Sequence, residues 1–343
     1  MKVLIYSGYY KEPWGPNNMR GTGGTEIAIS QISNKLSKFG WDIVVSGNVI
    51  SQMVDGVEWI ETKELHEKHF NSFDIIIGVS YLHFVLEFEE YDAKKIFWVH
   101  NTDFYPWYMG TEIQDPESLL TPLDIDQFVC LTNWHKEQWS QKYSIDPERI
   151  SVIGNGLNPE EFITNIKKEK GRFIWSSSQE RGLTELISNW QKIRNEIPHA
   201  TLHVYSPPYD IAERLNYNEY DLEGIEFMGS VTPNELHIAM QRAEYWMYLT
   251  EYEETYCITA LEMQKSNVIP IVTCVAALEE TVNSGIIVEN NKTKWEFCIQ
   301  LLRQLSDPIK DKVISSNQNW VKMQTWNMRS YDWKQLIESH VSR

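Results

Sequence analysis

Short apolar runs alternate with amphipathic stretches along the chain, and this alternation predicts an α/β fold. In the first half, KVLIY at residues 2–6 is typical of a buried parallel strand, and residues 25–39 show the three- and four-residue spacing of an amphipathic helix. A loop rich in glycine, proline and asparagine connects the two. Further strands are expected at residues 42–46, 74–79, 95–99, 127–131 and 150–153. These elements predict one doubly wound unit.

The same alternation begins again after a polar segment at residues 155–170. Strands are expected in RFIWSSS, ATLHVY, GIEFMG, NVIPIV, GIIVE and residues 244–249, with helices at residues 181–196, 294–304 and 331–341. We therefore predict two Rossmann-like domains that face a cleft, at residues 1–165 and 166–324. A substrate is expected where the carboxyl ends of the strands converge.

Length and charge limit the kinds of partner. The 343 residues suffice for two domains, and the net charge of −17 repels nucleic acid and anionic membrane surfaces. The amino terminus lacks a basic segment followed by a long apolar run, and nothing approaches the roughly 18 apolar residues of a membrane span. We expect a cytoplasmic protein without a transmembrane segment. The four cysteines have no metal-ligand spacing, so we expect reduced thiols.

The segment EYEETYCITALEMQKSNVIPIV at residues 251–272 is the most informative. Glu254 and Glu262 stand eight positions apart where a strand passes into a helix. If that helix starts near Tyr256, the free amides of its first turn form a site for an anion or for sugar hydroxyls. The two carboxylates can accept hydrogen bonds from a sugar and from a ribose. On spacing alone, two solvated helix charges remain the commoner explanation.

Several segments in this order resemble the retaining GT-B glycosyltransferases of the family-4 type. The strand, the E-x7-E pair and the following proline-containing strand resemble the donor-sugar motif, and GTGGTEIAIS resembles the glycine-rich loop that approaches the donor phosphates. IFWVHN places His100 where the family has its active-site histidine. FVCLTNWHKEQW followed by ISVIGNGLNPEEF resembles the segment that leads into the interdomain linker, and FIWSSSQERGLTELI resembles the opening of the nucleotide domain. The resemblance spans essentially the full length.

The resemblance implies a set of site residues. Those expected to be catalytic are His100, Glu254 and Arg181. Those expected to bind the donor are Gly23, Gly24, Ser177, Gly229, Val231, Thr255, Tyr256, Cys257, Ile258 and Glu262, and those expected on the acceptor side are Trp14, Tyr105 and Trp107. The chain departs from the family at two places. Thr255 and Cys257 replace usual glycines, and the usual Arg plus Lys pair on the diphosphate is reduced to Arg181 with Ser177 near the other position.

The function that the resemblance implies is transfer of a sugar from a UDP- or GDP-linked donor to a hydroxyl of a glycan or protein-linked glycan, with retention of anomeric configuration. Bond breaking leaves negative charge on the diphosphate, which Arg181 and backbone amides would stabilise. His100 would contact the sugar and is not assigned as a general base. The resemblance also implies that a carboxyl-terminal helix at residues 325–343 packs back on the first domain.

Other readings of the sequence remain open. Asp124 and Asp126 form a DxD ahead of a strand rather than after one, so we expect solvated carboxylates, no metal and no cofactor besides the nucleotide-sugar co-substrate. The glycines at residues 21–24 do not form GxGxxG, and no P-loop motif occurs. An epimerase-like enzyme acting on nucleotide sugars and a catalytically silent sugar-nucleotide-binding protein remain alternatives on the same fold.

Overall fold

The computed structural model describes residues 1–8, 13–17, 23–103, 125–163, 166–206 and 222–341, and the backbone alone at residues 107–108 and 111–112. The chain forms two compact units. Unit 1 comprises Met1–Gly156 with Trp326–Arg343, and unit 2 comprises Leu157–Thr325. Residues 157–165, which the sequence analysis assigns to the first domain, cluster with unit 2.

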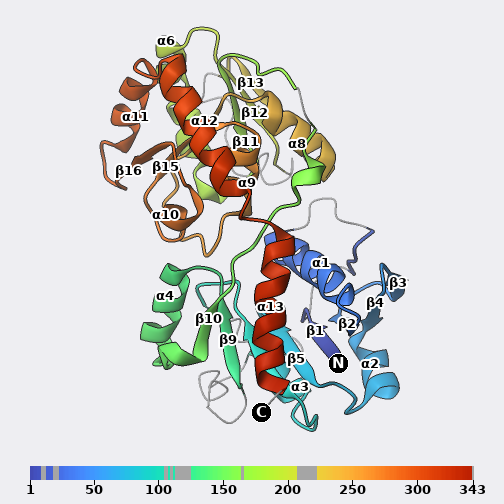
Figure 1. Cartoon of the computed structure of the whole chain (residues 1–343). Coiled ribbons are helices and arrows are strands. Elements are labelled where there is room, and N and C mark those ends of the chain that lie inside the picture. The colour runs from blue at the N-terminus through green and yellow to red at the C-terminus, as the bar shows by residue number, and fades with distance from the viewer. Residues whose placement is uncertain are drawn as a thin grey trace. The chain divides into compact units, whose positions relative to one another are not determined.

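Unit 1 is built on an eight-stranded sheet with the order β10-β9-β6-β5-β1-β2-β4-β3 (Figure 1). All neighbouring strands are parallel except β3, which pairs antiparallel with β4. The bounds are β1 Lys2–Tyr6, β2 Asp42–Gly47, β3 Gln52–Val54, β4 Val57–Glu61, β5 Ile75–Val79, β6 Lys94–Trp98, β9 Gln127–Cys130 and β10 Ile150–Val152. A separate two-stranded ribbon joins β7 (Trp107–Tyr108) and β8 (Thr111–Glu112). The predicted parallel α/β architecture is confirmed.

Helices cover both faces of this sheet because successive side chains of a strand point to opposite sides. The helices are α1 Gly24–Ser37, α2 Thr62–His69, α3 Phe84–Glu87 and α4 Asn133–Tyr143, with a short 3₁₀ turn η2 at Pro147–Arg149. Leu4 and Tyr6 of β1 share one apolar cluster with residues of α2, α3 and α4. Gly78 in β5 leaves room for Phe84, whose Cγ would lie 2.2 Å from a Cβ at that position.

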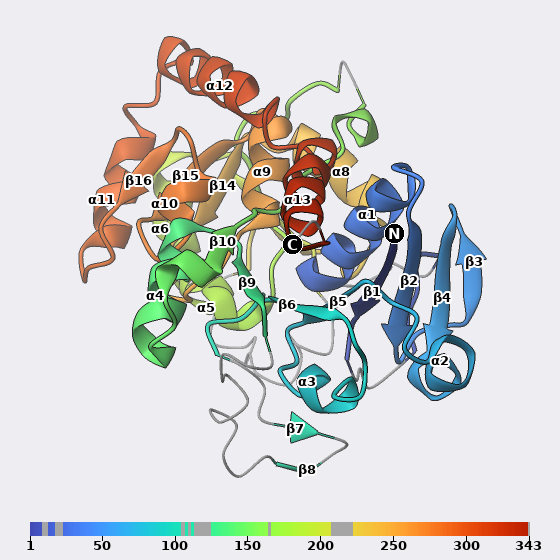
Figure 2. The same cartoon turned by 60° about the horizontal axis from the view of Figure 1, so that its bottom comes forward.

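The carboxyl-terminal helix α13, Trp326–Val341, belongs to unit 1 and runs along α1 (Figure 2). Its buried Trp333 packs edge-on against Trp98 of β6, with ring centroids 4.9 Å apart. Arg329 at its start donates a hydrogen bond from Nε to the Asn155 carbonyl at 3.1 Å. The helix thus packs on the sheet at Trp98, the last residue of β6.

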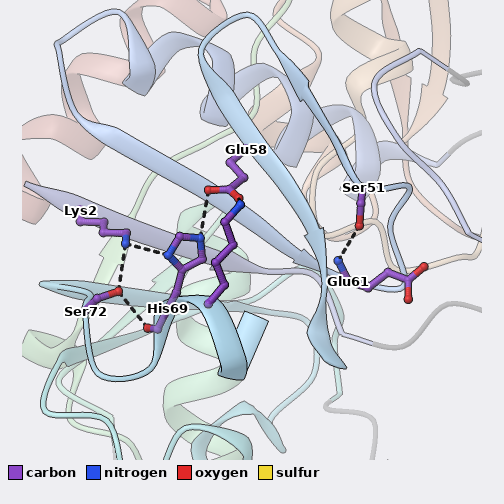
Figure 3. A network of polar contacts seen from close by, with 7 residues as sticks. Lys2, Ser51, Glu58, Glu61, His69 and Ser72 are labelled. Carbon is purple, nitrogen blue, oxygen red and sulfur yellow. Dashed lines mark hydrogen bonds and ion pairs between the residues drawn. The ribbon is translucent and has the colours of Figure 1, made fainter. Parts of the chain in front are cut away.

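A polar network ties the end of α2 to the starts of β1 and β4 (Figure 3). Lys2 Nζ lies 2.9 Å from His69 Nδ1 and donates to Ser72 Oγ at 3.0 Å. On the other side of the ring, His69 Nε2 lies 3.0 Å from Glu58 Oε2, and Glu58 also pairs with Lys68. Lys2 and Glu58 lie at the amino-terminal ends of their strands, away from the carboxyl ends where ligands bind in α/β sheets. We therefore assign this network to stability.

Unit 2 is built on a six-stranded, fully parallel sheet with the order β13-β12-β11-β14-β15-β16. The strands are β11 Arg172–Trp175, β12 Thr201–Val204, β13 Ile225–Phe227, β14 Tyr245–Tyr248, β15 Ile269–Thr273 and β16 Ile286–Val288. The helices are α5 Leu183–Ser188, α6 Trp190–Glu196, α8 Pro233–Arg242, α9 Ile258–Lys265, α10 Leu278–Thr281, α11 Lys294–Leu302 and α12 Asp307–Val321, with 3₁₀ turns η3 Pro159–Glu161 and η4 Gln179–Arg181. In the part of the chain that the structure describes, no helix is long and apolar enough to cross a membrane.

Candidate functional site

Arg181 lies in the segment that follows β11, where it meets Glu254, another of the residues expected to be catalytic. It ends the turn η4, and its guanidinium pairs with Glu254 in the loop after β14. Tyr248 at the end of β14 donates a hydrogen bond to the same carboxylate oxygen, Oε1, at 2.6 Å. The ring of Tyr252 lies 4.2 Å from Arg181 Cζ as a cation–π partner. The arrangement fixes one cation at the edge of the sheet where ligands of α/β folds bind.

Burial and charge set the protonation states of this cluster. Burial alone would lower the pKa of Arg181, but the charge of Glu254 outweighs it and holds the pKa above its ordinary value. Burial raises the pKa of the Tyr248 hydroxyl well above its usual value, and Glu254 raises it further. Burial, and then the charge of Glu254, also raise the pKa of the Cys257 thiol. Arg181 therefore stays charged, Tyr248 stays a donor, and Cys257 stays a neutral thiol.

The helix after the Glu254 loop presents an open amino terminus. Helix α9 begins at Ile258, two residues later than the sequence analysis expects, with Cys257 at the N-cap position. Cys257 makes no side-chain cap to the first turn, and its thiol is a poor acceptor. Thr255 and Tyr256 lie in the preceding turn and are partly exposed. The Ala260 amide of the first turn donates to the Cys257 carbonyl at 3.0 Å. The positive dipole end of α9 still favours an anion at this terminus.

Glu262 lies on α9 and faces α8 rather than open solvent. Its Oε1 is 3.3 Å from Nε2 of His237, and 18% of its side chain remains exposed. His237 is 4% exposed and stacks on Phe162, with ring centroids 4.3 Å apart. Glu262 is thus held on one side by an imidazole while part of its carboxylate stays accessible.

A cavity of about 620 Å³ opens beside Arg181, between the loops that follow β11, β14 and β16. Its lining combines the rings of Tyr252 and Trp295 with charged and amide side chains. Lys294 in this wall is buried and donates from Nζ to Glu251 Oε1 at 2.9 Å and to Asn290 Oδ1 at 2.7 Å. Aromatic faces beside directed polar groups suit a polyol such as a sugar.

Three further donor candidates occupy loops of unit 2. Ser177 follows β11, and its carbonyl accepts a hydrogen bond from Trp175 Nε1 at 2.6 Å. Gly229 follows β13 with φ +68°, in the left-handed region that favours glycine. Val231 comes just before α8 and is partly exposed. Gly229 and Val231 therefore both lie in the loop between β13 and α8, at the carboxyl end of β13.

His100 lies in unit 1, two residues after β6, and is 7% exposed. Its ring contacts Trp98, with centroids 4.6 Å apart. Burial, with a smaller contribution from the charge of His135, lowers the pKa of His100 to about 3. The imidazole is therefore neutral at physiological pH, which agrees with giving it no role as a charged group.

Helix α4 anchors the segment that follows His100. His135 Nε2 lies 2.9 Å from the carbonyl of Asn101, and because a carbonyl only accepts, Nε2 carries the proton. Trp139 Nε1 donates to the same carbonyl at 2.9 Å. Burial lowers the pKa of His135 to about 4, so this hydrogen bond is made by a neutral ring.

Gly23 and Gly24, the described glycines of the loop, do not form the open phosphate site expected of them. Gly23 is the N-cap residue of α1 and Gly24 is its first residue. The Glu26 carboxylate lies over Gly23, and its Oε2 would stand 2.9 Å from a Cβ there. Burial raises the pKa of Glu26, partly offset by hydrogen bonds to the carboxylate from the backbones of Glu26 and Gly23. A carboxylate thus uses the Gly23 amide that the sequence analysis offers to a phosphate.

The acceptor-side candidates have different placements. Trp14 is 6% exposed and packs edge-on against Trp59, with ring centroids 5.3 Å apart, so its side chain contributes to the core of unit 1. Trp107 begins the short strand β7, and its side chain is outside the described part of the chain. Tyr105 lies outside the described residues altogether.

Of the two aspartates in the DxD sequence, the structure describes only the second. Asp124 lies outside the described residues, whereas Asp126 accepts from Lys94 Nζ at 2.9 Å and from the Lys95 amide at 2.8 Å. Among the residues that the structure describes, no group of three or more His, Cys, Asp or Glu side chains could hold a metal ion.

Sequence reasoning missed three side chains of the unit 2 site, namely Tyr248, Tyr252 and His237. Tyr248 ends a fully buried strand, so its apolar neighbours make it look like a core residue. His237 falls in a helix with nothing adjacent in sequence to indicate its partners. Only the folded structure reveals that Tyr248 contacts Glu254, that Tyr252 contacts Arg181 and that His237 contacts Glu262.

Comparisons with known proteins find a family match in unit 2 and solved structures of the same fold. Residues 170–307 match the model of the family described as glycosyl transferases group 1. The O-antigen chain mannosyltransferase RfbU of Salmonella typhimurium is 28% identical over 185 residues, which cover 51% of this chain and 50% of the relative. The match thus spans about half the length of that curated relative.

Two solved structures share the fold over nearly their full length. Sucrose-phosphate synthase from Thermosynechococcus elongatus superposes with a TM-score of 0.75 at 14% identity, covering 98% of each chain. HepE of Anabaena, solved in complex with UDP-glucose, gives a TM-score of 0.73 at 12% identity, covering 99% of this chain and 100% of the other.

The two largely parallel sheets and the likeness to these solved structures show the GT-B fold. The match to the group 1 glycosyltransferases covers residues 170–307, less than half of the chain and all of it within unit 2.

Proposed function

We propose that this enzyme transfers a sugar from a nucleoside-diphosphate sugar to a hydroxyl of a glycan, with retention at the anomeric carbon. The observation that carries the proposal is the Arg181 guanidinium, which pairs with Glu254 in the loop that leads into the amino terminus of α9. A cation and free amides at one strand edge are what a departing diphosphate requires.

The chemistry follows from where charge develops. The bond between the anomeric carbon and the diphosphate oxygen breaks, and its electron pair stays on the diphosphate. Arg181 and the α9 amides lower the energy of that anion. The second carboxylate oxygen of Glu254 can accept a hydrogen bond from a sugar hydroxyl. The acceptor oxygen then bonds to the anomeric carbon, and its proton passes to the diphosphate. A neutral His100 would serve this reaction through hydrogen bonding and not through charge.

The names of similar proteins support a choice of donor and acceptor. HepE binds UDP-glucose, and RfbU is a mannosyltransferase of the O-antigen chain. We infer a UDP- or GDP-linked hexose as donor and an oligosaccharide of the cell-surface polysaccharide type as acceptor. The cavity beside Arg181, with its aromatic and polar lining, supports a sugar at this position.

A donor panel tests the proposal. Nucleoside diphosphate released from UDP-glucose, UDP-galactose and GDP-mannose is measured with and without oligosaccharide acceptors. We expect one donor to release diphosphate, faster with acceptor, and to give a product with the anomeric configuration of the donor. Interconversion of nucleotide sugars without release would instead identify an epimerase-like enzyme. Binding without any turnover would identify a silent sugar-nucleotide-binding protein.

We also expect that transfer needs no divalent metal. Asp126 is engaged with Lys94 and the backbone, and Arg181 with the α9 amides can neutralise the leaving group. With saturating donor and excess EDTA, the rate should stay within about twofold of the untreated rate, because no metal-bound charge is lost. Complete loss that Mn²⁺ or Mg²⁺ restores would contradict this and return Asp124 and Asp126 to consideration.

A further inference from the structure

We propose that His237 is a positioning residue that holds Glu262 ready for the ribose of the donor and makes donor affinity depend on pH. The inference rests on the proposed function, because it requires that Glu262 binds the nucleotide. Beyond the proposed function, the inference assigns a role to His237 and predicts that donor affinity changes with pH.

Three elements of unit 2 hold the His237 ring. It projects from α8, which begins directly after the loop at residues 228–232. Its Nε2 lies 3.3 Å from Glu262 Oε1 on α9, and its Nδ1 lies 4.0 Å from Glu161 Oε2 on η3. Phe162 stacks on its face at 4.3 Å with an interplanar angle of 24°. With 4% exposure, the ring has little freedom to turn away from Glu262.

The charges around the ring favour imidazolium. The charged groups that face it are Glu262 from α9 and Glu161 from η3. Burial lowers the pKa of His237, but the hydrogen bond and charge of Glu262, followed by the charge of Glu161, raise it more, and the net pKa lies above 6.5. His237 is therefore protonated below that raised pKa and loses its charge as pH rises through it.

Protonation of His237 changes Glu262 in two ways. A charge-assisted hydrogen bond from imidazolium is stronger than one from neutral imidazole, so it fixes the carboxylate more firmly for the ribose hydroxyls. The imidazolium also offsets one of the two carboxylate charges, whereas a neutral ring leaves both to repel the donor diphosphate. Both effects make the donor bind more tightly below the pKa of His237 than above it.

Glu161 offers a way to change the titration without touching the donor carboxylate. Its side chain is 38% exposed, and it ends η3, whereas Glu262 is on α9. Phe162 and Leu157 of the same segment share an apolar cluster with Leu261, the neighbour of Glu262. Replacing Glu161 by Gln therefore removes a charge from a supported position and keeps the volume of the side chain.

The experiment measures the Kd of UDP-glucose and of GDP-mannose by calorimetry between about pH 6 and about pH 8.5, a range that brackets a raised histidine pKa. The diphosphate diester of these probes keeps its charge across this range. In the wild type we expect affinity to fall about three- to tenfold over this range, a coupling of ordinary size. His237→Gln retains a donor near Nε2 without a titrating group, so its affinity should be nearly independent of pH. His199→Gln, at an exposed histidine, is the control and should follow the wild type.

Glu161→Gln is the second variant, and it should move the midpoint of the affinity change to lower pH because one stabilising charge is gone. An affinity that falls equally in His237→Gln and wild type would overturn the inference, as would an unmoved midpoint in Glu161→Gln. A wild type that binds both probes with no pH dependence also overturns it, while leaving the proposed function intact. A wild type that binds no nucleotide sugar would refute the proposed function and the inference together.

Discussion

Replacing Arg181 by Ala should lower the turnover number by about two to four orders of magnitude, the range found for removing a cation or donor from a developing anion. Arg181 is the cation fixed at the carboxyl end of β11 by Glu254 and by the ring of Tyr252. Its side chain is 28% exposed, so part of the guanidinium remains accessible to a phosphate oxygen. Arg181→Lys should recover only part of the rate, because a point charge cannot bind an oxyanion through two bonds. Steady-state kinetics with saturating donor measure the effect.

The same substitution leaves Glu254 with a buried charge and only the Tyr248 hydroxyl as a described partner, so a loss of stability must be separated from a loss of catalysis. The double variant Arg181→Ala with Glu254→Gln removes the orphaned charge and should fold while remaining slow. Arg194→Ala is the matched control, since Arg194 also pairs with a glutamate, Glu223. Arg194 lies on α6, away from the loop of Glu254 in the sequence. Normal turnover in Arg181→Ala would remove this residue from the site.

The order of elements was predictable because each strand and helix carries its own period. Residues 2–6 form β1, and the helix expected at residues 25–39 spans Gly24–Ser37. The edge strand β3 and its neighbour β4 were missed because β3 has only three residues and β4 interrupts its apolar residues with Glu. The helix expected at residues 181–196 is broken at Asn189, whose side-chain amide donates to the Glu185 carbonyl at 2.9 Å. Such local competition with the backbone leaves no trace in the apolar spacing.

The donor loop was predictable to its segment but not to its contacts. The sequence places Glu254 and Glu262 at a strand-to-helix junction, and the structure has Glu254 in the loop before α9 and Glu262 on α9. Their partners could not be found in the same way, because Tyr248, Arg181 and His237 come from three different elements. Which side chain meets a carboxylate depends on how strands and helices pack, and spacing along the chain carries no such information.

Trp333 of α13 gives the second large effect, on the stability of unit 1. Its side chain is fully buried and packs on Trp98, and Trp98 in turn contacts His100, two residues further along the chain. Trp333→Ala should lower the free energy of unfolding by about 3–5 kcal/mol, because it removes a large apolar side chain and leaves a cavity. The ring of Trp98 then loses its support from α13, so the position of His100 should loosen as well.

Hydrogen exchange on the full-length variant tests this prediction unit by unit. Peptides from residues 1–156 should lose protection in Trp333→Ala, with the largest change around β6, whereas peptides from residues 157–325 should exchange as in the wild type. Gln335→Ala is the control, because Gln335 is exposed on the same helix and its loss should change stability by no more than about 0.5 kcal/mol. Equal protection of both units in wild type and Trp333→Ala would show that α13 does not support the sheet. Loss confined to unit 1, with slower transfer by the folded fraction, would show that the helix supports both the sheet and the segment that carries His100.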